Sequence, residues 1–177
     1  MTQDILLEQI MKGDSNAYSQ FYNKYVNDLY SYALGLGFPE NICIHDVFCK
    51  IYTNKYEFNE VQNIKYYLFR SLKNRLIDIT KRKKGISIDD INEFVFNIET
   101  SIVDSLIDKE EQERLKSKVD SLMNSLTNNQ REAIYLRYMQ EMEYEDIAKI
   151  LNINIESARK LVHRAIEKLR SQTNLDL

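Results

Sequence analysis

The amino-acid sequence predicts an all-α protein, built as two small helical domains that are joined by an acidic linker. Glycine and proline are rare, at four and one in 177 residues, and all of them lie in the first half of the chain. The Asn-Gly and Asp-Gly pairs that mark tight β-hairpins are absent from the sequence. Apolar residues instead recur at spacings of three and four along most of the chain, which is the spacing of one helix face.

Four helices are expected in the first domain, which we place at residues 1–84. They are predicted over residues 2–12, 15–34, 40–56 and 62–83. Gly35 and Gly37 are suited to end the second of these helices, and Pro39 is suited to begin the third. The second helix carries a stripe at helical spacing, made of Tyr18, Tyr22, Tyr25, Val26, Leu29 and Ala33.

The third and fourth helices each have an apolar face and a polar face. The apolar face of the third helix carries Ile44, Val47, Phe48 and Ile51, with Lys55 at its end. The other face of that helix carries Asp46, Cys49, Lys50 and Thr53. The core stripe of the fourth helix is made of Ile64, Leu68, Leu72, Leu76 and Ile79.

The formal net charge of −3 conceals an uneven distribution of charge. Lysine and arginine dominate residues 65–84, where Asp78 is the only acidic residue. Aspartate and glutamate dominate the predicted linker, residues 85–114. A second basic run follows at residues 159–170, with Glu167 as its only acidic residue. Two basic segments separated by an acidic one favour two surfaces that face polyanions and are joined by a tether.

The linker gives way to a second helical region. Residues 85–104 show no sustained period, and their frequent Ile, Phe and Val leave two interpretations open: disorder, or an extended segment that lies on a partner. A helical pattern resumes at Ser105. Thr127 and Gln130 then form a capping-box sequence, which predicts a helix that runs through about Met139.

Residues 143–170 have the form of a helix-turn-helix, so the second domain, residues 115–177, is expected to contain this motif. Asn152 lies where the chain must turn, and asparagine tolerates the left-handed conformation better than most residues. Asn154 is a good N-cap for a second helix that runs from Ile155 to about residue 170. The residues expected to pack in the two helices are Ile147, Ala148, Leu151, Ala158, Leu161, Val162, Ala165 and Leu169.

The exposed face of the second helix of this motif is basic, and it carries Arg159, Lys160, His163 and Arg164. The first half of this helix enters the DNA major groove in proteins that use the motif, where long cations contact phosphates or guanine. DNA binding is therefore expected here, with Lys160 or His163 at base edges and Arg164 at a phosphate. The alternative is a solvated basic helix in an ordinary bundle.

The fourth helix of the first domain mixes aromatic, cationic and amide side chains away from its core stripe. This set consists of Tyr66, Tyr67, Arg70, Lys73, Asn74, Lys81 and Arg82. Rings stack on unpaired bases and cations follow the phosphate backbone, so the mixture predicts contact with single-stranded or opening DNA. The alternative is that both tyrosines belong to the core or its rim, and that Asp78 and Arg82 form only an i, i+4 pair.

Taken in order, these segments resemble the extracytoplasmic-function (ECF) class of RNA polymerase sigma factors over nearly the whole chain. The segments GDSNAYSQFYNKYVNDLYSYA, NICIHDVFCKIY and YYLFRSLKNRLIDITKRKK resemble successive helices of sigma domain two. The segment LMNSLTNNQREAIYLRYMQEMEYEDIAKILNINIESARKLVHRAIEKLR resembles sigma domain four. No part of the chain remains for the additional domains of housekeeping sigma factors. The sequence departs from the family pattern at His45, Thr127, Glu141, Glu143 and Asn152.

The resemblance implies a bacterial sigma factor that binds core RNA polymerase and promoter DNA and directs promoter-specific initiation. Docking on the clamp helices of the largest polymerase subunit is implied for His45, Asp46, Cys49 and Lys50. Melting and reading of the minus-ten element is implied for the mixed set on the fourth helix. Reading of the minus-thirty-five element is implied for Arg159, Lys160, His163 and Arg164. The acidic linker is implied to lie near the RNA exit path, and an anti-sigma factor is left open as a partner.

Two other classes of DNA-binding or helical protein compete with this interpretation. A repressor or activator with a response-regulator-like helix-turn-helix would account for the C-terminal region, but not for the mixed set on the fourth helix or the face around Asp46. A purely structural helical adaptor would show no affinity for DNA, even at low salt.

Enzymatic and metal-binding functions find little support. The sequence has no Gly-rich phosphate loop, nucleophile elbow or HExxH motif. Cys43, His45 and Cys49 invite a metal site, but Cys43 falls on the opposite side of the helix, so neither metal nor cofactor is expected. No apolar run approaches the ~20 residues of a membrane span, and two cysteines make no disulfide framework. A cytoplasmic protein without a small-molecule substrate is expected.

Overall fold

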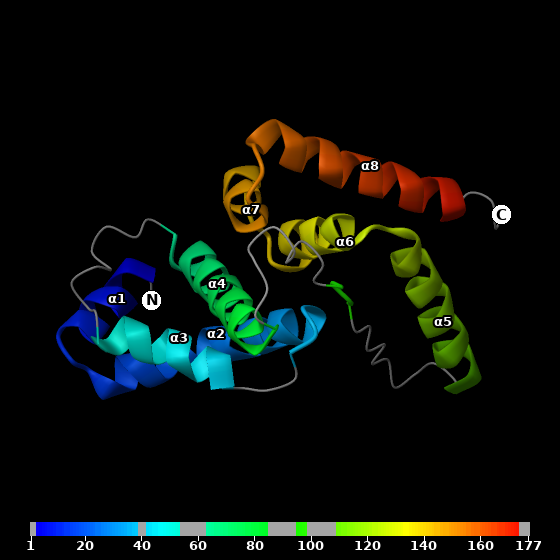
Figure 1. Ribbon diagram of the computed structural model, residues 1–177. Coiled ribbons are helices and arrows are strands. Elements are labelled where there is room, and N and C mark those ends of the chain that lie inside the picture. Colours follow the sequence, from blue (N-terminus) through cyan, green and yellow to red (C-terminus); the bar gives the residue numbers. More distant parts are fainter. Residues whose placement is uncertain (1–2, 39–41, 54–62, 85–94, 99–108, 174–177) are drawn as a thin grey trace. The chain divides into compact units, whose positions relative to one another are not determined.

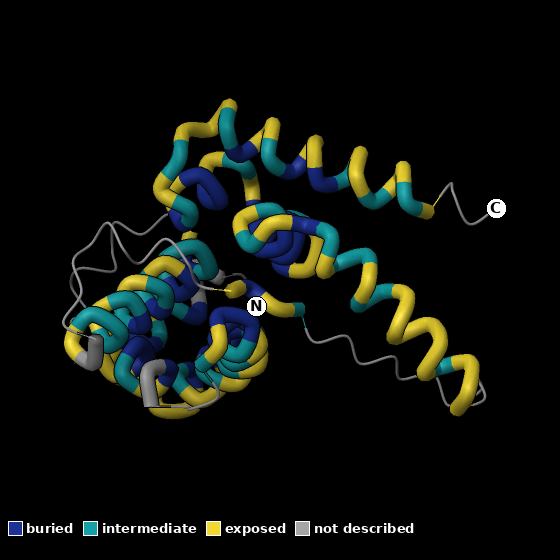
Figure 2. The backbone as a smooth tube through the Cα atoms, turned by 45° about the vertical axis from the view of Figure 1, so that its right-hand side comes forward, coloured by how far each residue is buried: buried dark blue, intermediate teal, exposed yellow. Residues whose placement is uncertain are grey.

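The computed structural model describes residues 3–38, 42–53, 63–84, 95–98 and 109–173 (Figure 1). Every regular element within these ranges is helical, so the predicted all-α fold class is confirmed. The chain divides into two compact units, Met1–Asn92 and Glu93–Leu177, and each has its own core. Figure 2 shows buried residues on the inner side of most helices, whereas α5 (Lys109–Ser125) carries only exposed and half-buried residues.

The first unit is built from four helices at nearly the positions that the sequence predicts: α1 (Gln3–Met11), α2 (Ser15–Gly35), α3 (Ile42–Thr53) and α4 (Ile64–Lys84). The long helix α2 packs against each of the other three, and α3 also packs against α4. A polar side chain caps the first turn of α2, and a left-handed glycine follows its last turn. The Asp14 carboxylate accepts hydrogen bonds from the backbone N–H groups of Asn16 and Ala17, at 2.8 and 3.2 Å. Gly37 adopts a φ of 84° just beyond the helix, a conformation that favours glycine.

The core of the first unit is rich in aromatic rings. Phe21 of α2 meets Phe48 of α3 edge to face at 5.7 Å between ring centroids, and Tyr32 of α2 lies 4.9 Å from Phe69 of α4. The core stripe predicted for α4 is largely confirmed, because Ile64, Leu68, Leu72 and Leu76 are fully buried. Ile79 is only half-buried, and the sequence pattern missed Phe69.

The buried face of α2 includes Tyr25, Leu29 and Ala33 of the predicted stripe but is displaced at the stripe's other positions. Tyr18, Tyr22 and Val26 are only half-buried, whereas the neighbouring positions Ala17 and Phe21 are buried. The displacement follows from the packing: α2 contacts three helices at once, so its buried face is wider than a single stripe. Predicted positions Pro39 and Lys55 lie outside the described residues.

The second unit contains α5 (Lys109–Ser125), α6 (Asn128–Ile134), the π-helical turn η3 (Tyr135–Met139), α7 (Tyr144–Leu151) and α8 (Ile155–Thr173). Helix α8 packs against α5, α6 and α7 and so holds the unit together. The capping box before α6 is confirmed. Thr127 Oγ1 accepts from the Gln130 backbone N–H at 3.3 Å, and Gln130 Oε1 accepts from the Thr127 N–H at 3.0 Å. Because α5 begins at Lys109, the last residues of the predicted 85–114 linker are helical.

One short piece of the predicted linker is anchored on the second unit. Phe96 is buried, at 1% exposure, and its ring lies 5.3 Å from that of Tyr135. The next residue, Asn97, accepts a hydrogen bond through its Oδ1 from the Arg131 guanidinium at 3.4 Å. Asn124 and Asn128 also accept from this buried guanidinium, at 3.3 and 2.6 Å. Residues 95–98 therefore pack against the second unit of the same chain.

This anchor is expected to stabilise the second unit. Replacing Phe96 by Ala removes a buried aromatic ring and leaves a cavity, so the free energy of unfolding should fall by about 3 kcal/mol. The neighbouring Val95 is 54% exposed, and Val95→Ala is the matched control with an expected loss below about 0.5 kcal/mol. Urea unfolding followed by far-UV circular dichroism measures both. Equal losses in the two variants would show that the ring contributes nothing specific.

Candidate nucleic-acid interface

The turn between α7 and α8 has the geometry that the sequence predicts. Asn152 adopts φ 54° and ψ 45°, the left-handed conformation, and the Ile153 N–H closes the turn on the Ala148 carbonyl at 2.9 Å. The Asn154 side chain accepts from the Ser157 backbone N–H at 2.7 Å and caps α8. The helix-turn-helix is therefore confirmed.

Small residues allow α7 and α8 to approach closely. Ala148 on α7 and both Ala158 and Ala165 on α8 are buried, together with Ile147 and Val162. Three further residues expected in the core are only half-buried: Leu151, Leu161 and Leu169. The sequence pattern missed Ile150 and Asp146, both of which are buried. The stripe thus fixes which side of α8 faces outward.

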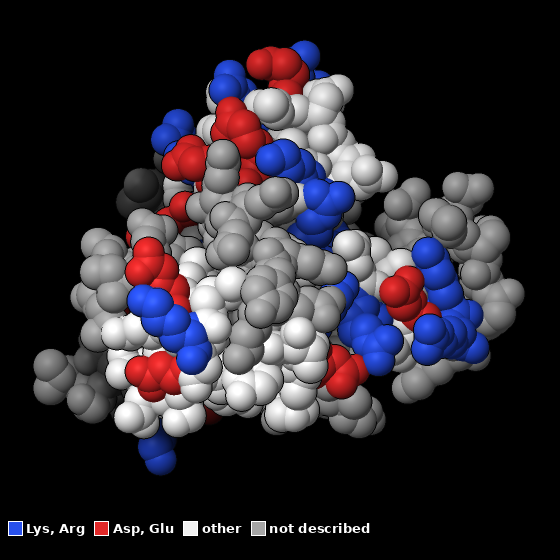
Figure 3. Space-filling view, turned by 90° about the vertical axis from the view of Figure 1, so that its left-hand side faces the viewer, with Lys and Arg blue, Asp and Glu red and all other residues white. Residues whose placement is uncertain are grey.

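The outward side of α8 brings together all four basic residues predicted there. Arg159, Lys160, His163 and Arg164 are exposed, and they line a shallow hollow with Tyr144 of α7 and Glu167. The His163 ring pairs with Glu167, with 3.3 Å between Nδ1 and Oε2. On the face of the molecule shown in Figure 3, lysine and arginine side chains gather in groups, with acidic side chains beside them.

Tyr144 and Arg137 are neighbours of this surface that the sequence analysis did not single out. The Tyr144 ring lies within cation–π range of two guanidinium groups, 4.8 Å from Arg137 Cζ and 5.8 Å from Arg159 Cζ. Tyr144 is the first residue of α7 and Arg137 belongs to η3, so neither residue lies on α8. Helical periodicity within α8 therefore could not reveal their contact with it.

The mixed set on α4 is only partly exposed. Arg70, Asn74 and Arg82 are exposed, whereas Tyr66, Tyr67, Lys73 and Lys81 are half-buried. The Tyr66 hydroxyl accepts a hydrogen bond from Arg70, whose Cζ lies 5.7 Å from the Tyr66 ring centroid. The two tyrosines therefore lie at the rim of the core, as in the alternative interpretation, and Tyr66 is hydrogen-bonded to a neighbouring cation.

The polar face of α3 also differs from expectation at one residue. His45, Cys49 and Lys50 are exposed, and Cys49 Sγ lies 3.3 Å from His45 Nε2. Asp46, in contrast, is paired with Arg75 of α4, whose Nη2 and Nε lie 2.7 and 3.2 Å from Asp46 Oδ2. The Asp46 carboxylate thus links α3 to α4.

Aromatic residues adjoin this face of α3. Tyr52, 47% exposed, meets Tyr18 of α2 edge to face at 5.3 Å. Burial, followed by the effects of Cys49, Tyr22 and Tyr52, raises the pKa of the Tyr18 hydroxyl above its usual range. Tyr18 therefore stays a neutral hydrogen-bonding group at physiological pH.

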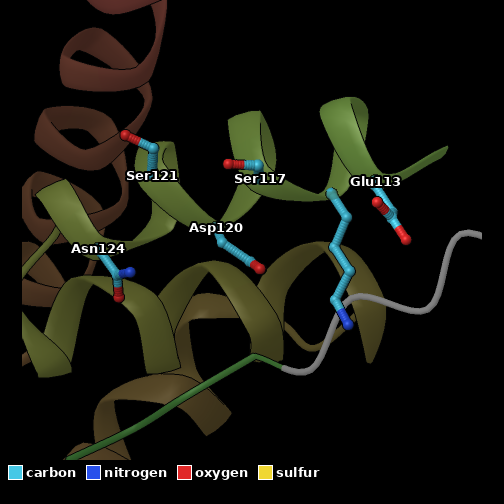
Figure 4. Close-up of a pocket in the computed structure, with 6 residues that line it drawn as sticks. Glu113, Ser117, Asp120, Ser121 and Asn124 are labelled. Carbon is cyan, nitrogen blue, oxygen red and sulfur yellow. The ribbon is translucent and has the colours of Figure 1, made fainter. Parts of the chain in front are cut away.

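Sites for small ligands are not evident in the parts of the chain that the structure describes. No three His, Cys, Asp or Glu side chains among these residues come together as a metal site would require, and the Cys43 side chain lies outside them. A second hollow runs along α5, lined by Glu113, Lys116, Ser117, Asp120, Ser121 and Asn124 (Figure 4). Among the described residues, no helix is both long and apolar enough to cross a membrane.

Comparison with known proteins identifies the family. The family model for sigma-70, region 4 matches residues 116–169, which extend from α5 into α8. SigM of Bacillus subtilis, an ECF RNA polymerase sigma factor, is 25% identical over 88% of this chain and 94% of its own length. The ECF RNA polymerase sigma-E factor of Escherichia coli is 26% identical over 96% of this chain and 93% of its own. The chain is an ECF-class sigma factor.

Solved structures share the fold of this ECF sigma factor. CnrH, solved in complex with the cytosolic domain of CnrY, matches with a TM-score of 0.61 at 20% identity over 98% of this chain and 97% of its own. The sigma factor RpoE of Bartonella quintana, solved with the anti-sigma factor NepR, matches with a TM-score of 0.60 at 24% identity. The match covers 90% of this chain and 98% of RpoE. The ECF class consists of transcription initiation factors and is not an enzyme family.

The conformation of Asn152 gives a direct test of the turn in this sigma factor. Asn152→Ala should lower the free energy of unfolding by about 1 kcal/mol, because a left-handed backbone strains a residue whose side chain cannot compensate locally. Asn152→Gly should stay within about 0.5 kcal/mol of the parent, since glycine adopts this conformation freely. Thermal unfolding compares the two. A turn that does not depend on a left-handed residue would tolerate both changes equally.

Proposed function

We propose that this ECF sigma factor binds core RNA polymerase and directs promoter-specific initiation, reading the minus-thirty-five element with α8 and melting the minus-ten element with α4. The observation that carries this proposal is the basic face of α8. Arg159, Lys160, His163 and Arg164 project together from the second helix of a well-formed helix-turn-helix. In this motif the N-terminal half of that helix enters the major groove, where cations meet both phosphates and base edges.

Helix α4 offers a second surface suited to DNA. Arg70, Asn74 and Arg82 are exposed and can contact phosphates and base edges, while the half-buried Tyr66 and Tyr67 present part of their rings. A partly exposed ring can stack on a base that has left the duplex. With Lys73 and Lys81 alongside, this surface supports a role in holding the opened minus-ten strand.

The face of α3 is our candidate for polymerase docking. His45, Cys49 and Lys50 are exposed, and so is the ring of Tyr52 on the same helix, which gives a surface with polar and aromatic groups. We place the clamp helices of the largest polymerase subunit here. Asp46 contributes through its link to Arg75, which ties the docking helix to the candidate minus-ten helix.

The remaining assignments follow from the same proposal. Residues 1–84 act as sigma domain two and residues 115–177 as sigma domain four. The acidic residues of the 85–114 segment lie near the RNA exit path of polymerase. An anti-sigma factor is a further proposed partner, because the structurally similar Bartonella sigma factor was solved with one.

Selection of binding sites by alanine variants tests the role of α8. The full chain is assembled with core polymerase, and Arg159, Lys160, His163 and Arg164 are changed to Ala one at a time. Loss of a phosphate contact weakens binding to all DNA. It also reduces the slope of the logarithm of the binding constant against the logarithm of the salt concentration by about one. Loss of a base contact costs about 1–3 kcal/mol on the preferred site and relaxes the preference at one or two base pairs. If all four variants keep the parent's preference and affinity, α8 is not the reader.

A charge reversal on α3 tests the docking face. Lys50→Glu should weaken binding to core polymerase while leaving thermal unfolding unchanged, because Lys50 is exposed. Lys12→Glu, an equal change at an exposed position just after α1, is the matched control and should bind core normally. Asp46→Asn should instead lower stability by up to about 1 kcal/mol, since it weakens a partly exposed ion pair. Equal core affinity of the Lys50 and Lys12 variants, measured by competition, contradicts this docking site.

A further inference from the structure

We infer that Tyr144 is a positioning residue of the α8 surface: its ring, with the Glu145 carboxylate, orients the Arg159 guanidinium toward a base edge. This inference rests on the proposed reading of DNA by α8 and refines it. It adds to the surface a residue of α7 that makes no part of the basic face, and it assigns distinct tasks to the cations of that face.

Arg159 is surrounded by three groups. Its Cζ lies 5.8 Å from the centroid of the Tyr144 ring, and its Nη2 lies 3.9 Å from Glu145 Oε1. Its Nη1 lies 3.6 Å from Glu156 Oε1, one turn earlier on α8. The ring and one carboxylate therefore come from the first turn of α7, and only the other carboxylate comes from the helix that carries Arg159.

The Tyr144 ring is itself held in place from behind the surface. Arg137 Cζ lies 4.8 Å from the ring centroid, and its Nη1 donates a hydrogen bond to the Met142 carbonyl at 2.7 Å. The same guanidinium reaches Glu143 Oε2 at 3.3 Å. Arg137 is hydrogen-bonded to the backbone just before α7. Its contact with the Tyr144 ring therefore holds that ring in place relative to the helix-turn-helix.

The other cations of the face are held differently. Within the described part of the chain, no hydrogen bond or ion pair engages the side chains of Lys160 or Arg164. A cation with free rotamers suits a phosphate, because attraction to a phosphate has little directional demand. A base edge requires two aligned hydrogen bonds, which a guanidinium with a fixed plane supplies at a smaller cost in side-chain entropy. Arg159 is thus the base reader, whereas Lys160 and Arg164 grip phosphates; this moves Lys160 from its expected place at a base edge.

The carboxylates guide Arg159 without trapping it. The distances of 3.6 and 3.9 Å exceed those of a hydrogen bond, and the Arg159 side chain is 53% exposed. Ion pairs of this kind in solvent are weak, so the guanidinium can turn toward DNA while the ring limits its orientation. The hollow that Tyr144 lines together with Arg159, Lys160 and His163 leaves the space in front of the guanidinium open.

The test compares Tyr144→Leu with Tyr144→Phe in the full chain assembled with core polymerase, by binding-site selection and by competition with random DNA. Tyr144→Leu removes the ring. It should reduce the preference by about fivefold or more, at the same base pair that Arg159→Ala affects. Tyr144→Phe keeps the ring and should keep the preference. Affinity for random DNA and its salt dependence should stay unchanged in both. The double variant with Arg159→Ala should lose no more preference than Arg159→Ala alone.

Glu145→Gln provides a second test that leaves the ring and the core untouched. It should relax the preference at the same base pair, whereas Glu167→Gln, an equal change of charge that faces His163 instead, should not. The inference is overturned if Tyr144→Leu keeps the parent's preference with normal thermal unfolding, if Tyr144→Phe loses as much as Tyr144→Leu, or if the double variant is additive. If the preference is unchanged in all alanine variants of the α8 face, the proposed function itself fails.

Discussion

The left-handed turn at Asn152 is the constraint on which the second unit depends. It ends α7 and redirects the chain, so that Asn154, two residues further on, can cap α8. For most residues this conformation costs about 1–2 kcal/mol, and asparagine reduces that cost through its short polar side chain. Because the turn sets how α8 leaves α7, it also decides which side chains of α8 face outward and that Tyr144 meets Arg159.

The two units are stabilised by different kinds of packing. The first uses large rings, with Phe21, Phe48 and Phe69 fully buried among aliphatic side chains. The second buries small alanines on α7 and α8, together with the rings of Phe96 and Tyr135. In both units the burial of apolar side chains dominates, since the ion pairs are mostly exposed and worth at most about 1 kcal/mol each. The exposed charges of α8 are therefore available for recognition, whereas the buried Arg131 guanidinium takes part in the packing of the second unit.

Local patterns in the sequence predicted most of the fold. The capping box at Thr127, the turn at Asn152 and the outward face of α8 each depend on residues within a few positions of one another, and each is confirmed. The stripe predicted on α2 matches only part of the buried face, because three helices share that face. The partner of Asp46 lies in another helix, so its pairing with Arg75 left no periodic signal. The anchor at Phe96 was missed for a related reason: four residues without regular structure have no period to detect.

Transcription in vitro tests the central claim, that this sigma factor directs initiation, most directly. Purified core polymerase is supplied with a genomic template, with and without the full chain, and the 5′ ends of the transcripts are mapped. The account predicts discrete start sites that appear only with the chain, and upstream sequences that share two conserved elements. Binding of the chain to DNA without any new start site would contradict it and would favour a repressor that uses the same helix-turn-helix.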